Sequence, residues 1–171
     1  MEKLSTVIFL IRHGQTDRAY STDPNLDGER ILTEQGRAQL NKVGEYLKSF
    51  APSKIYSSPV KRTIESAEVI KEQIGDITIE TTQRLFEVYS NERFNESFTD
   101  GPKFLQELAQ KHTGEHIICV SHQDVIEQFV RGLGATNEEA QFPCKTAQGY
   151  RVVLAQDIFV EITKISPADA V

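Results

Sequence analysis

Several cationic or nucleophilic side chains follow predicted strands of this chain. His13 comes directly after Arg12 at the end of one apolar run, and His122 follows Ser121 at the end of another. Arg62 lies about one turn into the helix predicted after a short strand. Because the carboxyl ends of parallel strands meet at one sheet edge, we expect these groups to converge near helix N-termini, which favour anions. Guanidinium groups grip two oxygens each and imidazoles donate to oxygen or attack phosphorus, so the set predicts a site for tetrahedral phosphate.

The composition limits which ligands such a site serves. The 171 residues carry a formal net charge of -6, which argues against a nucleic-acid partner because that affinity depends on neutralising many phosphates. The apolar run at residues 7–11 is too short for a signal peptide or a membrane span. We expect a cytoplasmic protein with a small phosphorylated substrate and no membrane partner. The sequence contains no coiled-coil heptad pattern, so it does not predict an oligomeric state.

The cysteines and remaining histidines do not predict a metal site. Cys119 and Cys144 lack the paired spacing of zinc ligands and cannot build a disulfide framework, so we expect reduced thiols. His112 and His116 are four apart, but Gly114 lies between them and no third ligand is near. The sequence therefore predicts neither a metal nor a cofactor.

The elements that position the candidate residues follow from the spacing of apolar residues. Strands are predicted at residues 7–11, 54–57, 77–80 and 117–120, with a closing strand pair within 150–165. Helices are predicted at residues 33–50, 58–74, 102–112 and 124–132. Thr33 and Ser58 are the predicted N-caps of the first two helices. Residues 14–31 and 85–101 lack periodicity and are predicted to be irregular.

Strands that alternate with amphipathic helices predict the fold class. Each parallel connection needs a crossover, so the pattern indicates an α/β three-layer sandwich with a mostly parallel sheet and helices on both faces. No linker, repeat or low-complexity segment divides the chain. We expect residues 1–171 to form a single domain.

Four segments in order resemble motifs of the histidine phosphatase superfamily, which includes cofactor-dependent phosphoglycerate mutase. They are Leu10-Ile-Arg-His-Gly-Gln-Thr16, Leu32-Thr-Glu-Gln-Gly-Arg, Tyr56-Ser-Ser-Pro-Val-Lys-Arg-Thr and Val120-Ser-His. The matches span residues 10 to about 130. The resemblance implies a phosphoglycerate mutase-like fold and membership of the compact phosphatase branch.

The same resemblance implies roles for individual residues. His13 would be the nucleophile that forms a phosphohistidine, while Arg12, Arg62 and His122 hold the nonbridging oxygens. An imidazole attacks only through an unprotonated nitrogen. We therefore expect a backbone carbonyl in the loop beginning at Gly14 to hold the other ring nitrogen.

Glu87 is the candidate for the catalytic acid. It lies in Arg84-Leu-Phe-Glu-Val-Tyr, which resembles the acid motif of the family. A carboxylic acid with a raised pKa usually protonates such a leaving group and later deprotonates the attacking water. Glu92 and Glu96, which lie in the irregular segment 85–101, could take this role instead.

The chain departs from the family pattern at three positions. Gln123 and Asp124 follow the second histidine where glycine is common, and Ala19 stands where many members have asparagine. Asp124 brings a negative charge near the anion, so we expect an altered pocket. Ala19 leaves the hydrogen bond of that asparagine to Thr16, Tyr20 or water, so we expect weaker phosphate affinity. The residues expected to line the mouth are Arg18, Tyr20, Arg30 and Arg93.

The resemblance implies a histidine acid phosphatase-type phosphoric monoester hydrolase, a metal-independent phosphatase that hydrolyses phosphomonoesters through phosphohistidine. A phosphoglycerate mutase-type phosphotransferase is a second hypothesis. By this resemblance, mutases of the family are longer chains whose insertions enclose the active site and exclude water. Here only residues 85–103 are available to cover the site. A phosphohistidine protein phosphatase is a third hypothesis. A non-catalytic phosphate-binding module is a fourth, and the three departures from the family pattern favour it.

Overall fold

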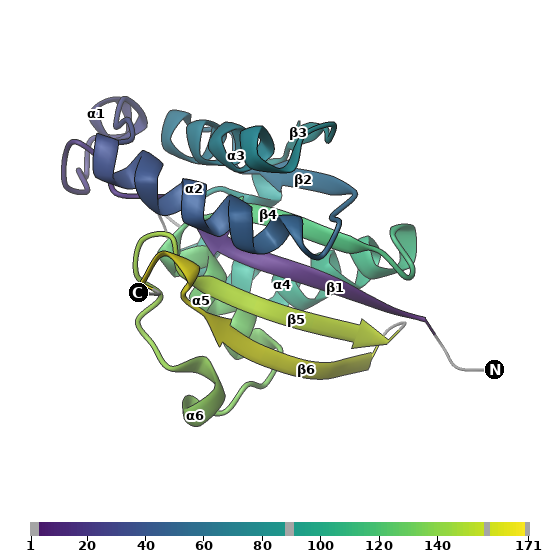
Figure 1. Ribbon diagram of the computed structural model, residues 1–171. Helices are drawn as coiled ribbons and strands as arrows, with labels where there is room; N and C mark the ends of the chain where they lie inside the picture. The colour runs from purple at the N-terminus through teal and green to yellow at the C-terminus, as the bar shows by residue number, and fades with distance from the viewer. Residues whose placement is uncertain (1–3, 88–90, 156–157, 170–171) are drawn as a thin grey trace.

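The computed structural model describes residues 4–87, 91–155 and 158–169, with only the backbone given for residues 91–99 and 160. Within these ranges one central sheet has the strand order β3-β2-β4-β1-β5-β6 (Figure 1). The strands are β1 (Ser5–Arg12), β2 (Lys54–Ser57), β3 (Ile79–Thr81), β4 (His116–Ser121), β5 (Gly149–Ala155) and β6 (Ile158–Ile165). β1, β2, β3 and β4 pair in parallel, whereas β5 runs antiparallel to both β1 and β6.

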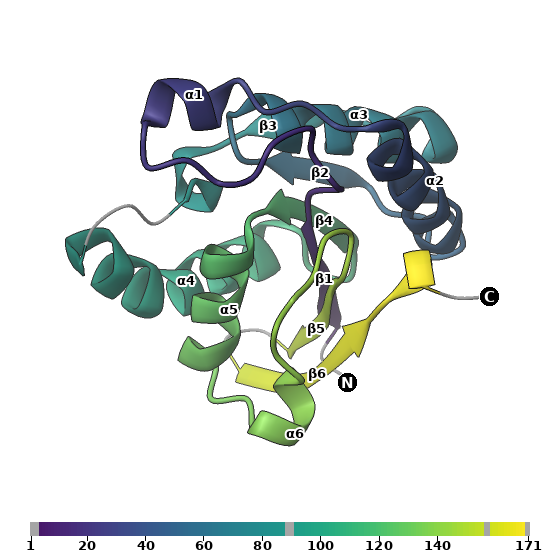
Figure 2. The same ribbon diagram turned by 90° about the vertical axis from the view of Figure 1, so that its left-hand side faces the viewer.

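Helices cover both faces of the sheet, with α2 and α3 on one face and α4 and α5 on the other (Figure 2). The helical segments are α1 (Pro24–Gly28), α2 (Glu34–Lys48), α3 (Lys61–Ile74), η1 (Gln83–Leu85), α4 (Asn91–Lys111), α5 (Gln123–Gly132), α6 (Asn137–Ala140) and η2 (Pro167–Asp169). Alternate residues of β1 enter two different apolar clusters, so this strand is buried on both sides. The predicted three-layer α/β sandwich is confirmed.

The start of α2 packs closely against the chain that follows β1. Thr33 caps the helix as predicted, and its Oγ1 accepts from the Gly36 N–H at 3.0 Å. A Cβ added at Gly36 would lie 2.2 Å from the Gln15 carbonyl oxygen, and one at Gly14 would lie 2.3 Å from Leu40 Cδ2. Glycine at both positions therefore allows the helix to support the segment that carries the first histidine.

The predicted cap at Ser58 is wrong. α3 begins at Lys61 and its N-cap residue is Val60. The Ser58 hydroxyl instead lies 2.8 Å from His122 Nε2, and its carbonyl accepts from Thr63 Oγ1 at 2.8 Å. Ser58 therefore makes a long-range contact with His122 instead of the local helix cap that the sequence pattern predicted.

The irregular segments also differ from prediction. Residues 14–31 contain the short helix α1, and residues 91–101 belong to α4, which has Pro102 in its interior. A Cβ at Gly101 would lie 2.4 Å from Phe129 Cδ1. The predicted helix start at Pro102 is therefore wrong, and the glycine before it permits close packing of α4 on α5.

Candidate active site

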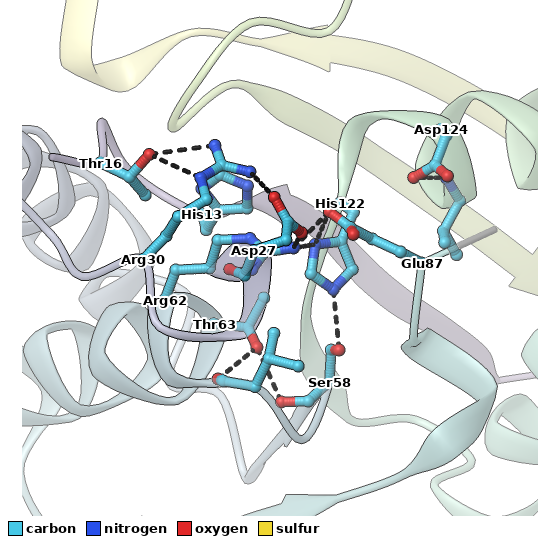
Figure 3. Close-up of polar contacts among 12 residues, drawn as sticks. His13, Thr16, Asp27, Arg30, Ser58, Arg62, Thr63, Glu87, His122 and Asp124 are labelled. Atoms are coloured by element: carbon cyan, nitrogen blue, oxygen red, sulfur yellow. Dashed lines mark hydrogen bonds and ion pairs between the residues drawn. The ribbon is translucent and has the colours of Figure 1, made fainter. Parts of the chain in front are cut away.

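Both candidate histidines lie at the carboxyl edge of the parallel strands. Arg12 ends β1 beside Ser121, which ends β4, so His13 and His122 follow neighbouring strands. Their ring centroids are 5.6 Å apart with the planes inclined at 65°. Figure 3 shows the two rings together with Arg62 and Glu87 in one cluster. The structure thus brings the predicted site residues to a single place.

His13 is held in one orientation by its neighbour. The ring is 2% exposed, and Nδ1 lies 2.8 Å from the Gly14 carbonyl oxygen, which can only accept a hydrogen bond. Nδ1 therefore carries the proton and Nε2 keeps its lone pair. Burial, His122 and Arg12 together hold the pKa of His13 well below its ordinary value. The arrangement provides a neutral imidazole with an available nitrogen.

Arg62 lies in the first turn of α3 and is fully buried. Its Nη1 donates to the Asp27 carbonyl at 3.0 Å, and its Nη2 donates to Asp27 Oδ2 at 3.1 Å. Asp27, also fully buried, accepts from Arg30 Nη1 at 3.0 Å. Asp27 was not predicted as a site residue. Its only signal in the sequence was the length of the segment 14–31 that contains it.

Glu87 contacts both Arg62 and His122. Its Oε1 accepts from Arg62 Nη2, and His122 Nδ1 lies 3.1 Å from the same oxygen. Burial raises the pKa of Glu87, but hydrogen bonds from His122 and Arg62, together with the charge of Arg62, outweigh burial and lower it below its ordinary value. The expected raised pKa is therefore wrong for this state, in which Glu87 is an ionised carboxylate.

His122 lies between Glu87 and Ser58, which follows β2. Burial lowers the pKa of His122 despite the opposing effect of Glu87, which indicates a neutral ring. With its proton on Nδ1, the ring donates to Glu87, and Nε2 accepts from the Ser58 hydroxyl. Ser58 is thus a second residue of the site that local sequence patterns assigned elsewhere.

Arg12 is oriented by residues distant in sequence. Its Nη1 donates to Gln123 Oε1 at 2.9 Å and to the Cys144 carbonyl at 3.1 Å. Gln123, one departure from the family pattern, therefore positions a cation of the site. Asp124, the next departure, accepts through Oδ1 from the Val125 N–H at 2.9 Å.

A cavity of about 570 Å³ opens above these groups. Its lining residues are Arg12, His13, Ala19, Tyr20, Arg30, Glu87, Gln123, Asp124, Glu127 and Gln128. Of the residues expected at the mouth, Tyr20 and Arg30 line the cavity, whereas Arg18 pairs with Asp17 at 3.5 Å. The side chains of Arg93, Glu92 and Glu96 lie outside the described residues.

The remaining candidates for metal or thiol chemistry have other environments. His112 lies 2.7 Å from the Tyr56 hydroxyl and 2.8 Å from Glu115. Cys119 and Cys144 are buried free thiols, and burial raises the pKa of Cys144 to about 12. Within the part of the chain that the structure describes, no cluster of metal-ligating side chains is found. None of the helices described there combines the length and the hydrophobicity of a transmembrane segment.

Known proteins resemble this chain in sequence. The model of the histidine phosphatase superfamily, branch 1, matches residues 8–100. The chain is 32% identical over 138 residues to a 5''-phosphoribostamycin phosphatase of Niallia circulans, covering 74% of this chain and 64% of that protein. It is 26% identical over 159 residues to phosphoglycerate mutase-like protein 4 of Arabidopsis thaliana, covering 71% of this chain and 68% of that protein.

Solved structures share the fold across nearly the whole chain. The protein histidine phosphatase SixA complexed with tungstate has a TM-score of 0.71 at 20% identity, covering 95% of this chain and 98% of that one. A phosphoserine phosphatase mutant from Entamoeba histolytica with bound phosphoserine also has a TM-score of 0.71 at 20% identity, covering 96% and 98%. A phosphoglycerate mutase from Bacillus anthracis has 0.72 at 15% identity, covering 97% and 95%. The fold is therefore phosphoglycerate mutase-like.

Proposed function

Because this chain belongs to branch 1 of the histidine phosphatase superfamily, we propose that it is a phosphatase that hydrolyses small phosphomonoesters through a phosphohistidine on His13. The observation that carries the proposal is the contact of His13 Nδ1 with the Gly14 carbonyl, which leaves Nε2 unprotonated. Arginines supply the positive charge that the reaction needs, so the proposed mechanism is metal-independent and uses no cofactor. The proposal places the enzyme in the cytoplasm as a single domain.

The first chemical step forms the bond between His13 Nε2 and phosphorus and breaks the bond between phosphorus and the leaving oxygen. Arg12 Nε is buried without a hydrogen-bond partner, which supports its role as a donor to a nonbridging oxygen. Arg62 and His122 become donors to phosphate once Glu87 withdraws from them. Their role is to stabilise the charge that is redistributed in the transition state.

Glu87 transfers the protons in this mechanism. Phosphate competes for the groups that hold Glu87 ionised and brings negative charge beside it, so its pKa rises and it takes up a proton. It gives that proton to the leaving oxygen. In the second step it accepts a proton from the water that attacks the phosphohistidine, which releases phosphate and restores His13.

A mutase activity is the second candidate, supported by the phosphoglycerate mutase-like relative and by the mutase of the same fold. A mutase returns the phosphoryl group to an acceptor and needs a priming bisphosphate. A phosphohistidine protein phosphatase, like its structural neighbour SixA, would act on a phosphorylated protein. A binding module would retain phosphate without turnover.

Turnover of p-nitrophenyl phosphate in EDTA tests the proposal. Wild-type protein is expected to release phosphate, and His13→Ala is expected to abolish release while the fold is retained. Acid-quenched wild-type enzyme should carry acid-labile, base-stable phosphate on His13. Binding without turnover would indicate the module, and phosphoryl exchange with negligible phosphate release would indicate the mutase. A screen of phosphomonoesters with a phosphohistidine protein alongside identifies the substrate class.

A further inference from the structure

One wall of the active-site cavity carries an acceptor that the phosphatase mechanism does not use. Gln128 lines the cavity and is 4% exposed, and its Oε1 is buried without a hydrogen-bond partner. The great majority of buried polar side-chain atoms in folded proteins have such a partner. A carbonyl oxygen can only accept, so the group that satisfies it must be a donor.

A carboxylate lies beside this acceptor. Glu127 lines the same cavity and is 9% exposed. Its Oε2 accepts from the Cys144 N–H at 3.2 Å, and its Oε1 lies 3.9 Å from Arg131 Nη2, whose side chain is 46% exposed. The pairing with Arg131 is thus long and partly solvated, so it occupies this carboxylate only weakly.

The wall belongs to one face of α5. Asp124, Glu127 and Gln128 have the spacing of residues that share a helix face, and all three line the cavity. Asp124 also bonds to the backbone of its own first turn, a position that favours acidic residues, and Glu127 holds the Cys144 backbone. Those contacts account for the two carboxylates as structural groups, but they do not account for the buried Gln128 acceptor.

The balance of charge also favours a cation in the cavity. Among the described residues of the site, both histidines have lowered pKa values, so arginines provide the permanent positive charge. The arginines are Arg12, Arg30 and Arg62. Because Glu87 takes up a proton when phosphate binds in the proposed mechanism, the other carboxylates are Asp27, Asp124 and Glu127. A phosphate dianion adds further negative charge to this set. A positive group on the leaving part of the substrate would offset it.

We propose that the wall formed by Glu127 and Gln128 binds an ammonium group, so that the preferred substrates are phosphomonoesters whose leaving group carries an amine. An ammonium has three donors and can satisfy both an amide oxygen and a carboxylate. The cavity of about 570 Å³ extends from His13 to this wall and holds a leaving group larger than phosphate alone. The inference rests on the proposed phosphatase function and adds the class of substrate.

Matched pairs of substrates test the inference. Glucosamine 6-phosphate and glucose 6-phosphate differ at one carbon, which carries ammonium in the first and hydroxyl in the second. Phosphoethanolamine and ethyl phosphate form a second pair. With the amine protonated, the wild-type kcat/KM is expected to be at least about tenfold higher for the amine of each pair. Equal or lower values for the amines would overturn the inference.

Variants of Glu127 and Gln128 test whether the preference for amine substrates arises at this wall. Glu127→Gln keeps an oxygen for the Cys144 N–H but removes the charge, and Gln128→Leu removes the acceptor. Each is expected to lower the amine-to-hydroxyl ratio of kcat/KM by about fivefold or more. Glu72→Gln removes an exposed carboxylate of α3 and is the matched control, with the wild-type ratio expected. An unchanged ratio in both wall variants would contradict the assignment.

The proposed function and the inference can fail separately. Turnover of p-nitrophenyl phosphate without an amine preference would leave the phosphatase intact and overturn the inference. Absence of any turnover would overturn the phosphatase. In that case dissociation constants of the two sugar phosphates are compared by calorimetry, and tighter binding of the amine supports the wall whereas equal constants overturn it.

Discussion

Glu87 and Arg62 form a direct ion pair in the active site, although Arg62 is one of the groups expected to hold phosphate. Both side chains are almost entirely buried, and His122 Nδ1 contacts the same oxygen of Glu87. The carboxylate and a phosphate oxygen therefore need the same donors. Substrate binding in the proposed mechanism requires Glu87 to withdraw, and this requirement connects binding to the protonation of the catalytic acid.

Replacing the acid separates leaving groups by their basicity. Glu87→Gln cannot donate a proton, so kcat for alkyl phosphates is expected to fall by about a hundredfold or more. p-Nitrophenolate leaves without protonation, and its kcat is expected to fall by less than about tenfold. Steady-state rates for both substrate types check this difference. Equal slowing of the two would assign the acid to another residue.

The same variant should bind inorganic phosphate more tightly. Removing the charge of Glu87 frees Arg62 and His122 from a competing anion, so the dissociation constant is expected to fall by about fivefold or more at neutral pH. Isothermal titration calorimetry measures it. Asp76→Asn, which changes an exposed carboxylate away from the site, should keep the wild-type constant. Weaker binding by Glu87→Gln would show that the carboxylate does not compete with phosphate.

Acid should destabilise the protein through its buried histidines. Burial lowers the pKa of His13 and His122 in the folded state, whereas an unfolded chain has histidine pKa values near 6.5. As pH falls below 6.5 the unfolded chain binds more protons, so the free energy of unfolding decreases. Urea unfolding at several pH values should show a shallower decrease for His13→Gln. A slope equal to that of wild type would argue against a lowered pKa at His13.

Asp27, which pairs with both Arg30 and Arg62, is expected to be essential for the stability of the folded protein. Asp27→Ala leaves Arg62 and Arg30 buried without the carboxylate they share, and breaking a buried pair costs about 3–5 kcal/mol. Asp76→Ala on the surface should change the free energy of unfolding by less than about 0.5 kcal/mol. Urea unfolding of both variants provides the comparison. Similar values for the two would mean that Asp27 contributes no more than a surface charge.

A methyl group at Gly36 should disturb the nucleophile from a distance. The added Cβ would meet the Gln15 carbonyl at 2.2 Å, so the segment after His13 must shift. Gly36→Ala is expected to lose about 1–3 kcal/mol of stability and to lower kcat. Gly28→Ala, where nothing lies within 4 Å of the added carbon, is the matched control and should keep wild-type kcat. Normal kcat in both variants would dissociate this packing from catalysis.

The sequence predicted much of the frame because it depends on short patterns. The apolar runs that became β1 and β4 predicted buried parallel strands, and parallel pairing placed His13 and His122 at one edge. The spacing from Thr33 predicted a capped helix, which the structure contains. Each of these conclusions used residues within one element and a general rule of sheet geometry.

The protonation and pairing of the site were decided by the tertiary structure. Glu87 is ionised here because His122 and Arg62, which is 25 residues away in the chain, contact it. The Ser58 side chain contacts His122 instead of capping α3. Asp27 and Gln128 gained their importance from burial, which no local pattern marks. Charge state depends on the solvent and the neighbours of a group, and those are set by residues distant along the chain.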